Sequence, residues 1–155
     1  MSEQTAKSRV KCREIMSKNI LAAKIDMSLH ETANLMKNND IGCLPVVENV
    51  TNKLLGIITD RDIVVRAIAD AKDISTTKVS DVMTSEVFSS KPDDFAFEAI
   101  RIMGDKQVRR IPIVDDAGIL QGIVSMADVA LEMEDEREIA ETLEEISSGT
   151  AFWKK

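Results

Sequence analysis

The sequence predicts an α/β fold, of the mixed α+β kind, made from two copies of one β-α-β-β-α unit. Three observations predict it: the chain repeats itself at a fixed offset, each copy holds short continuous apolar strands, and each copy brackets those strands with helical patterns. The 155 residues suit one domain or two very small ones. Because a single copy of roughly 60 residues buries little surface, we expect the two copies to pack as one unit.

The internal repeat is read from ordered matches along the chain. Met16 and Met83 lie in the similar phrases EIMS and DVMT, 67 residues apart. The same offset pairs Lys24 with Lys91, Asp26 with Asp93, Glu31 with Glu98, Met36 with Met103, Pro45 with Pro112, and Val47 with Val114. After one deletion an offset of 66 pairs Gly56 with Gly122, Ile57 with Ile123, and Asp62 with Asp128. Matches in this order indicate a tandem duplication.

Each copy is expected to begin with a short strand and an amphipathic helix. The apolar stretches 20–23 and 87–89 predict the first strands. A helical face in the second copy is formed by Phe97, Ile100 and Met103, with Ala96 and Ala99 beside it. The corresponding apolar positions in the first copy are Leu29, Ala33, Leu35 and Met36.

Two further strands and a closing helix complete each copy. The segments CLPVV (43–47) and RIPIV (110–114) are followed, after polar turns, by LLGII (54–58) and LQGIV (120–124). Such continuous apolar strands are typical of sheets covered by helices. A last helix is predicted to open at Asp60 and again near Met126, and the second extends to Ile146 as one long acidic helix.

The predicted organisation divides the chain into five parts. They are a polar N-terminal segment (1–11), the first repeat (12–70), a linker (71–78), the second repeat (79–131), and an acidic C-terminal helix and tail (132–155).

Composition excludes several functional classes. The net charge of −7 disfavours binding to nucleic acid or an anionic membrane surface. No apolar run approaches the roughly 20 residues of a membrane-spanning helix, and residues 1–11 are too polar for a signal peptide, so we expect a cytoplasmic protein. Two cysteines without a CxxC pair, and one histidine, predict no metal site. No nucleophile–base arrangement, P-loop or dinucleotide fingerprint is present, which predicts a non-enzyme that requires no cofactor.

The most informative segments are GIITDRD (56–62) and GIVSMAD (122–128), one in each copy. The spacing of Thr59 and Asp62, and of Ser125 and Asp128, is that of a capping box, in which a hydroxyl and an acid satisfy the first N–H groups of a helix. The same groups also suit a ligand. A carboxylate accepts hydrogen bonds from ribose hydroxyls, nearby helix N–H groups favour a phosphate, and glycine lets the backbone approach closely. The capping and ligand-binding interpretations are compatible, since a residue that caps a helix can also bind a ligand.

The duplicated pattern IM…LPVV…GIITDRDIV and VM…RRIPIV…GIVSMADVA resembles the CBS-domain pair, or Bateman module, from about Cys12 to about Leu131. The resemblance implies a stand-alone pair of β-α-β-β-α copies, packed sheet to sheet about a pseudo-two-fold axis with clefts between them. It also implies a homodimer, and adenosine-containing ligands such as AMP, ADP, ATP, S-adenosylmethionine or a dinucleotide.

The resemblance assigns roles residue by residue. The residues that it assigns to ribose binding are Thr59, Asp62, Ser125 and Asp128. Those for the adenine wall are Ile20, Pro45, Val87 and Pro112, and those for phosphate are Arg61, Arg109 and Arg110. The first copy has Gly42 and Cys43 where the second has Arg109 and Arg110, and Ala127 replaces Arg61. We therefore expect one phosphate-rich site assembled from both copies, and one weaker or empty site.

The leading functional hypothesis is a regulatory or energy-sensing module that binds an adenosine-containing ligand and acts on a separate protein. The alternative is a ligand-free structural or protein-interaction (dimerisation) module in which both motifs only cap helices. A third class, metal or redox sensing through Cys12, Cys43 and His30, is also considered.

Overall fold

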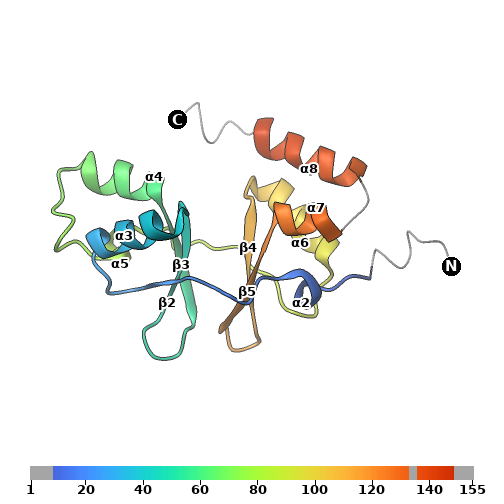
Figure 1. Cartoon of the computed structure of the whole chain (residues 1–155), viewed down its shortest axis with the longest axis horizontal. Helices are drawn as coiled ribbons and strands as arrows, with labels where there is room; N and C mark the ends of the chain where they lie inside the picture. Colours follow the sequence, from blue (N-terminus) through green and yellow to red (C-terminus); the bar gives the residue numbers. More distant parts are fainter. Residues whose placement is uncertain (1–8, 133–135, 149–155) are drawn as a thin grey trace. The chain divides into compact units, whose positions relative to one another are not determined.

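The computed structural model describes residues 9–132 and 136–148, which form two compact units (Figure 1). Unit 2 consists of Leu21–Val87 and Ala117–Leu120; unit 1 consists of the described residues of Met1–Ile20, Phe88–Asp116 and Gln121–Lys155. The units do not coincide with the sequence repeats, because residues that precede each repeat's first strand belong to the unit built on the other repeat.

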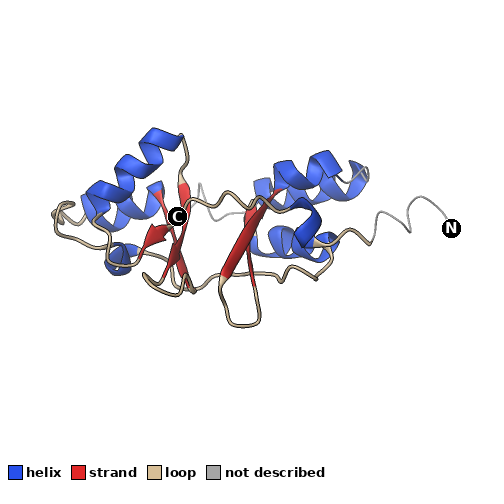
Figure 2. Ribbon diagram, turned by 60° about the horizontal axis from the view of Figure 1, so that its bottom comes forward, coloured by secondary structure: helices blue, strands red, loops and turns tan. Residues whose placement is uncertain are grey.

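Unit 2 is a three-stranded sheet of order β1-β2-β3 with helices on one side of it (Figure 2). The strands are β1 (Ala23–Lys24), β2 (Cys43–Val47) and β3 (Leu54–Thr59). The first two are parallel, and β2 pairs with β3 antiparallel. The helices are α3 (Leu29–Asn39), α4 (Asp60–Ile63), which continues into the π-helix η1 (Val64–Ile68), and α5 (Val79–Val82).

Helix α3 begins and ends with local signals. Ser28 and Glu31 form a capping box, and Asp40 ends the helix in the left-handed region at φ 52°. The buried face differs from the expectation: Thr32 is buried, whereas Ala33 and Leu35 are half-buried. A threonine is tolerated there because its hydroxyl donates to the Ser28 carbonyl at 2.8 Å, which leaves the group satisfied.

Unit 1 is built on two strands, β4 (Arg110–Val114) and β5 (Leu120–Ser125), which form a two-stranded sheet. Its helices are α2 (Cys12–Ile15), α6 (Ala96–Lys106), α7 (Met126–Glu132) and α8 (Glu136–Ser148). The predicted face of α6 is confirmed: Ala96, Ala99, Ile100 and Met103 are buried, and Phe97 packs half-buried against them.

The predicted first strands are shorter than expected. Strand β1 begins only at Ala23, and in the second repeat, instead of a strand over 87–89, Ser90 forms a single bridge with Ile113. Proline explains why the second repeat has a single bridge where the first has a two-residue strand. In the first repeat Ile25 N donates to the Val47 carbonyl at 3.1 Å, and the repeat-equivalent residue of Ile25 is Pro92, which has no N–H.

Two short helices that the sequence did not predict complete the units. Helix α5 precedes Thr84, whose backbone pairs with Ile57 of β3 at 2.8 and 2.9 Å. Helix α2 precedes Ser17, whose backbone pairs with Ile123 of β5 at 2.8 and 3.1 Å. The segment EIMS (14–17) therefore packs on β5 of the second repeat, and the segment DVMT (81–84) packs on β3 of the first repeat.

The prediction of one helix from Met126 to Ile146 is wrong. The structure has two helices, α7 and α8, and the intervening residues 133–135 lie outside the described residues. A straight helix would carry Ile146 about 30 Å from Met126, yet both pack on the core of unit 1. Helix α8 instead lies against α6, where the Gln107 amide donates to the Glu145 carbonyl at 3.5 Å. Within the described residues, no helix has the length and apolar character needed to cross a membrane.

Candidate functional site

Both strand-to-helix junctions form the predicted capping boxes. At the end of β3, Asp62 N donates to Thr59 Oγ1 at 3.1 Å, and Thr59 N donates to Asp62 Oδ2 at 3.0 Å. At the end of β5, the corresponding Asp128–Ser125 distances are 3.1 and 3.0 Å. The structure thus confirms the capping interpretation in each unit. In each cap one carboxylate oxygen, Oδ2, accepts the backbone hydrogen bond.

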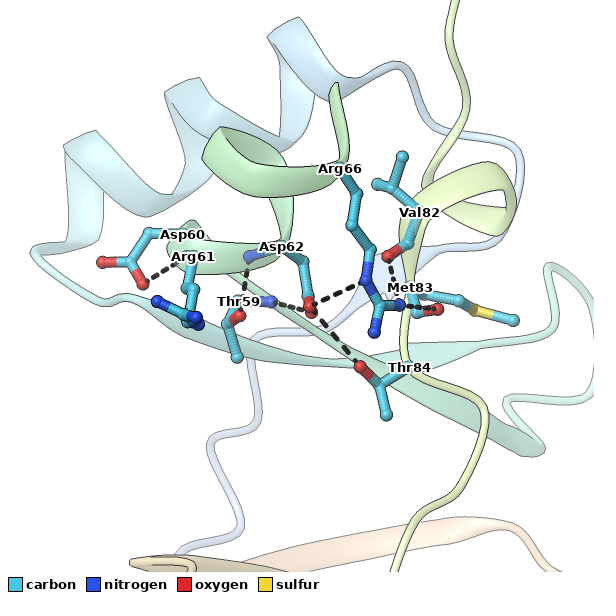
Figure 3. A network of polar contacts seen from close by, with 8 residues as sticks. All are labelled: Thr59, Asp60, Arg61, Asp62, Arg66, Val82, Met83 and Thr84. Carbon is cyan, nitrogen blue, oxygen red and sulfur yellow. Dashed lines mark hydrogen bonds and ion pairs between the residues drawn. The ribbon is translucent and has the colours of Figure 1, made fainter. Parts of the chain in front are cut away.

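The surroundings of Asp62 are crowded (Figure 3). Its Oδ1 atom accepts from the Thr84 hydroxyl at 3.5 Å and lies 3.8 Å from Arg66 Nε. Arg66 Nη1 in turn donates to the backbone carbonyls of Val82 and Met83 at 3.2 and 3.3 Å. Asp62 is only 9% exposed. The carboxylate is therefore enclosed by groups of its own unit.

Asp128 is less enclosed. It is half-buried, and among the described residues the Ser125 N–H is the partner seen on its carboxylate. The repeat-equivalent residues of Arg66 and Thr84 are Glu132 and Ser17. A glutamate cannot repeat the ion pair that Arg66 makes, so the two motifs differ chemically although their capping geometry is the same.

The residues beside the two motifs also differ in charge. Backbone geometry is shared: Asp60 N donates to the Gly42 carbonyl, and Met126 N donates to the Arg109 carbonyl, each at 2.9 Å. The Asp60 carboxylate lies over Gly42, so closely that a Cβ atom there would be 2.8 Å from Oδ2. The second motif has the exposed Arg109 and Arg110 at this place instead of a glycine and a cysteine.

The remaining predicted site residues are distributed over both units. Pro45 and Pro112 are buried within β2 and β4, and Arg61 is exposed at the start of α4. Ile20 and Val87 were expected on the first strands, but they lie outside them and are half-buried. By unit, Pro45, Thr59, Arg61, Asp62 and Val87 belong to unit 2, whereas Ile20, Arg109, Arg110, Pro112, Ser125 and Asp128 belong to unit 1.

Sequence reasoning missed Arg66 and Thr84. A signal for Arg66 was present, because an aspartate and an arginine four residues apart share a helix face. Thr84 comes from a segment 22 residues further along the chain, and only the folded structure places its hydroxyl beside Asp62.

The residues considered for metal or redox sensing are Cys12, Cys43 and His30. In the part of the chain that the structure describes, no group of three or more His, Cys, Asp or Glu side chains could hold a metal ion. Cys12 is fully buried in unit 1, Cys43 is half-buried in unit 2, and His30 is exposed. Burial, with Asp94 and Glu98 nearby, raises the pKa of the Cys12 thiol to about 11, which keeps it protonated at neutral pH.

The two thiols are therefore expected to differ in reactivity. At pH 7.5, about one unit below the pKa of a free cysteine, Cys43 is expected to react with a disulfide reagent in the folded protein. Cys12 is expected to react only after the protein unfolds. The measurement is the amount of reagent thiolate released, with and without denaturant, by the unmodified chain and by Cys43→Ser. Rapid native labelling of Cys12 in Cys43→Ser would contradict it.

The fold and these junctions define a tandem-repeat protein of the α+β class, with one capped aspartate motif in each copy. The family model of the CBS domain matches residues 12–68 and 79–135, and the chain belongs to this family.

Individual relatives extend the comparison. The chain is 36% identical over 119 residues to the CBS domain-containing protein YhcV of Bacillus subtilis, which covers 77% of this chain and 82% of the relative. It is 41% identical over 119 residues to the inosine-5′-monophosphate dehydrogenase of Methanocaldococcus jannaschii, but over only 23% of that enzyme. The solved CBS domain pair of protein MJ0100, in complex with 5′-methylthioadenosine and S-adenosyl-L-methionine, is 29% identical with a TM-score of 0.67, over 79% of this chain and 98% of the other.

Proposed function

We propose that this chain is a non-catalytic regulatory protein that binds an adenosine-containing small molecule, either an adenine nucleotide or S-adenosylmethionine. The observation that carries the proposal is the duplicated strand-to-helix junction, in which a reciprocal cap holds an aspartate in each copy. The similarity to a CBS pair described with two adenosyl compounds supports this ligand class.

The chemistry of the junctions suits such a ligand. A carboxylate oxygen accepts hydrogen bonds from the two neighbouring hydroxyls of a ribose, which no amide or hydroxyl side chain does as strongly. Arg109 and Arg110, next to the second junction, are permanently charged and donate in a planar fork, so they suit a phosphate or carboxylate on the same molecule.

Regulation requires more than binding. A ligand changes an equilibrium only if it binds one arrangement of the protein better than another. We propose that the output is a change in a homodimer or in a separate protein target, and that the protein acts in the cytoplasm. No catalytic step is assigned to the chain.

Thermal unfolding across a panel of AMP, ADP, ATP, S-adenosylmethionine and NAD tests the proposal. A ligand at a hundred times its Kd adds about 2.7 kcal/mol to the free energy of unfolding. For a protein of this size the unfolding midpoint is expected to rise by roughly 5–10 °C. Adenine-free GMP and methionine serve as controls. An unchanged midpoint with every adenosyl compound would contradict the proposal.

A second candidate function is a ligand-free interaction module. It is favoured by one specific observation: Asp62 uses both carboxylate oxygens within its own unit, as a purely structural cap does. Under this alternative no adenosyl compound binds, and size-exclusion chromatography with light scattering shows a dimer that no ligand alters.

A further inference from the structure

We propose that the chain forms a two-fold dimer in which helix α8 of each copy docks on the exposed side of α4 and η1 of the other copy. This inference rests on the homodimer of the proposed function and deepens it, because it names the two surfaces that meet. The family model ends its second match at residue 135, and α8 begins at Glu136, so α8 is not part of the CBS repeats themselves.

The exposed side of α4 and η1 is largely apolar. Val64, Val65 and Ile68 are 53%, 45% and 58% exposed. Together with the exposed Arg61 they have the spacing i, i+3, i+4, i+7, which places all four residues on one side of this helical segment. We call these four residues the η1 face. Apolar side chains that are exposed together mark an interaction surface, whereas scattered single ones need no explanation.

The closing helix of the second repeat is packed differently. In unit 1, α8 follows α7 and packs on both α6 and α7 (Figure 1). Ile146 of α8 reaches the core of unit 1, and the Gln107 amide donates to the Glu145 carbonyl. In unit 2, residues 69–78 follow η1 and form no helix, so the η1 face stays exposed. A helix like α8 is therefore the kind of element that this face lacks.

The outward side of α8 suits the η1 face. Ala140, Leu143, Glu144 and Ser147 have the same i, i+3, i+4, i+7 spacing, and all four are exposed, Leu143 by 43%. We call these four residues the α8 face. Two of them, Ala140 and Ser147, are small, and the distance between packed helices depends on the size of the side chains at the contact. A second helix can therefore approach α8 closely on this side.

The two faces complement each other in apolar surface and in charge. Of the five large apolar side chains that are exposed in the described part of the chain, four lie on these faces, and the fifth is Val50 in the turn after β2. Each face has one charged residue, Arg61 on the η1 face and Glu144 on the α8 face, and the two charges are opposite. Charge complementarity fixes the register of an interface. A second copy supplies both faces, and two-fold symmetry, the commonest in homo-oligomers, forms both contacts at once.

A charge exchange on the full chain, without added ligand, tests the pairing. Arg61→Glu places two glutamates at the contact, and Glu144→Arg places two arginines there. Each variant alone is expected to weaken the dimer by at least about tenfold, because like charges across an interface are costly. An equimolar mixture of the two variants restores opposite charges at both contacts of a mixed dimer, so the mixture is expected to recover the dimer mass.

Size-exclusion chromatography with light scattering, over a range of protein concentrations, measures the mass of each variant and of the mixture. Mixing restores a contact between two chains and leaves a contact within one chain unrestored. If both variants are monomeric and their mixture is monomeric as well, the proposed pairing of the two faces is overturned.

Ile68→Glu and Leu143→Glu test the apolar part of the contact. Each is expected to raise the Kd of the dimer about tenfold or more, because a charge becomes buried without a partner. Both residues are exposed within one chain, so thermal unfolding is expected to stay cooperative. Val50→Glu is the matched control, because Val50 is 84% exposed outside both faces, and it is expected to leave the dimer unchanged.

Two outcomes separate the contact from the homodimer of the proposed function. A dimer that persists unchanged in Ile68→Glu and in Leu143→Glu would overturn the assigned faces and leave the homodimer in place. An unmodified chain that is monomeric at every concentration would overturn both the contact and the homodimer.

Discussion

Replacement of Gly56 by valine is expected to lower the free energy of unfolding by about 3 kcal/mol, the upper end of the range for overpacking. A Cβ atom at Gly56 would lie 2.7 Å from the Thr84 carbonyl oxygen and 3.0 Å from the Met83 sulfur. The nearer atom belongs to the backbone, so relief requires the Thr84 segment to move away from β3. That movement also breaks the paired hydrogen bonds between Ile57 and Thr84.

Urea unfolding monitored by circular dichroism measures this loss, and Gly42→Ala is the matched control. At Gly42 the nearest atom is Asp60 Oδ2, 2.8 Å away, at the end of an exposed side chain and not on the backbone. The control is expected to cost less than about 1 kcal/mol, as most surface substitutions do. Equal losses for the two variants would contradict the packing of the Thr84 segment on β3.

Met103→Ala is expected to destabilise the protein by about 3–4 kcal/mol, since truncation of a buried Met or Leu costs 2–5 kcal/mol. Met103 is fully buried in unit 1, among Ile100, Ile111 and Cys12. Its removal leaves a cavity beneath α6 that the surrounding short elements cannot collapse to fill. The loss is read from the same urea titration as a lower midpoint.

Val64→Ala controls for the removal of apolar atoms alone, because Val64 is 53% exposed on η1. It is expected to change the free energy of unfolding by less than about 0.5 kcal/mol. If Met103→Ala lowers the free energy of unfolding no more than Val64→Ala does, Met103 is not packed in the core of unit 1 as described.

The parts of the fold that depend on local sequence were predictable. The four long strands followed from short apolar segments, and the face of α6 followed from the spacing of Ile100 and Met103. Both capping boxes followed from a hydroxyl and an acid three residues apart. In each case the deciding interactions join residues only a few positions apart in the chain.

The parts that depend on distant contacts were not predictable. The residues of the segments EIMS and DVMT give no sign that each segment packs on a strand of the other repeat. The closure of Asp62 likewise depends on Thr84, which arrives through that exchange. Pro92, which has no backbone N–H to donate, is visible in the sequence. Its effect becomes clear only by comparison with the first repeat, where the equivalent residue Ile25 donates to the Val47 carbonyl.

Divergence within the duplication explains why two nearly identical motifs need not do the same work. The sequence has Glu132 where the first repeat has Arg66, and Arg109 where the first repeat has Gly42, while the strand-to-helix junction is retained. The reciprocal cap is formed in both copies.

The most direct test of this account is an isothermal titration of the unmodified chain with AMP and with S-adenosylmethionine, in parallel, at one protein concentration. The account predicts saturable binding of at least one of them, with one molecule per chain. Titrations that show no heat of binding for either compound, in a protein that unfolds cooperatively, would contradict it.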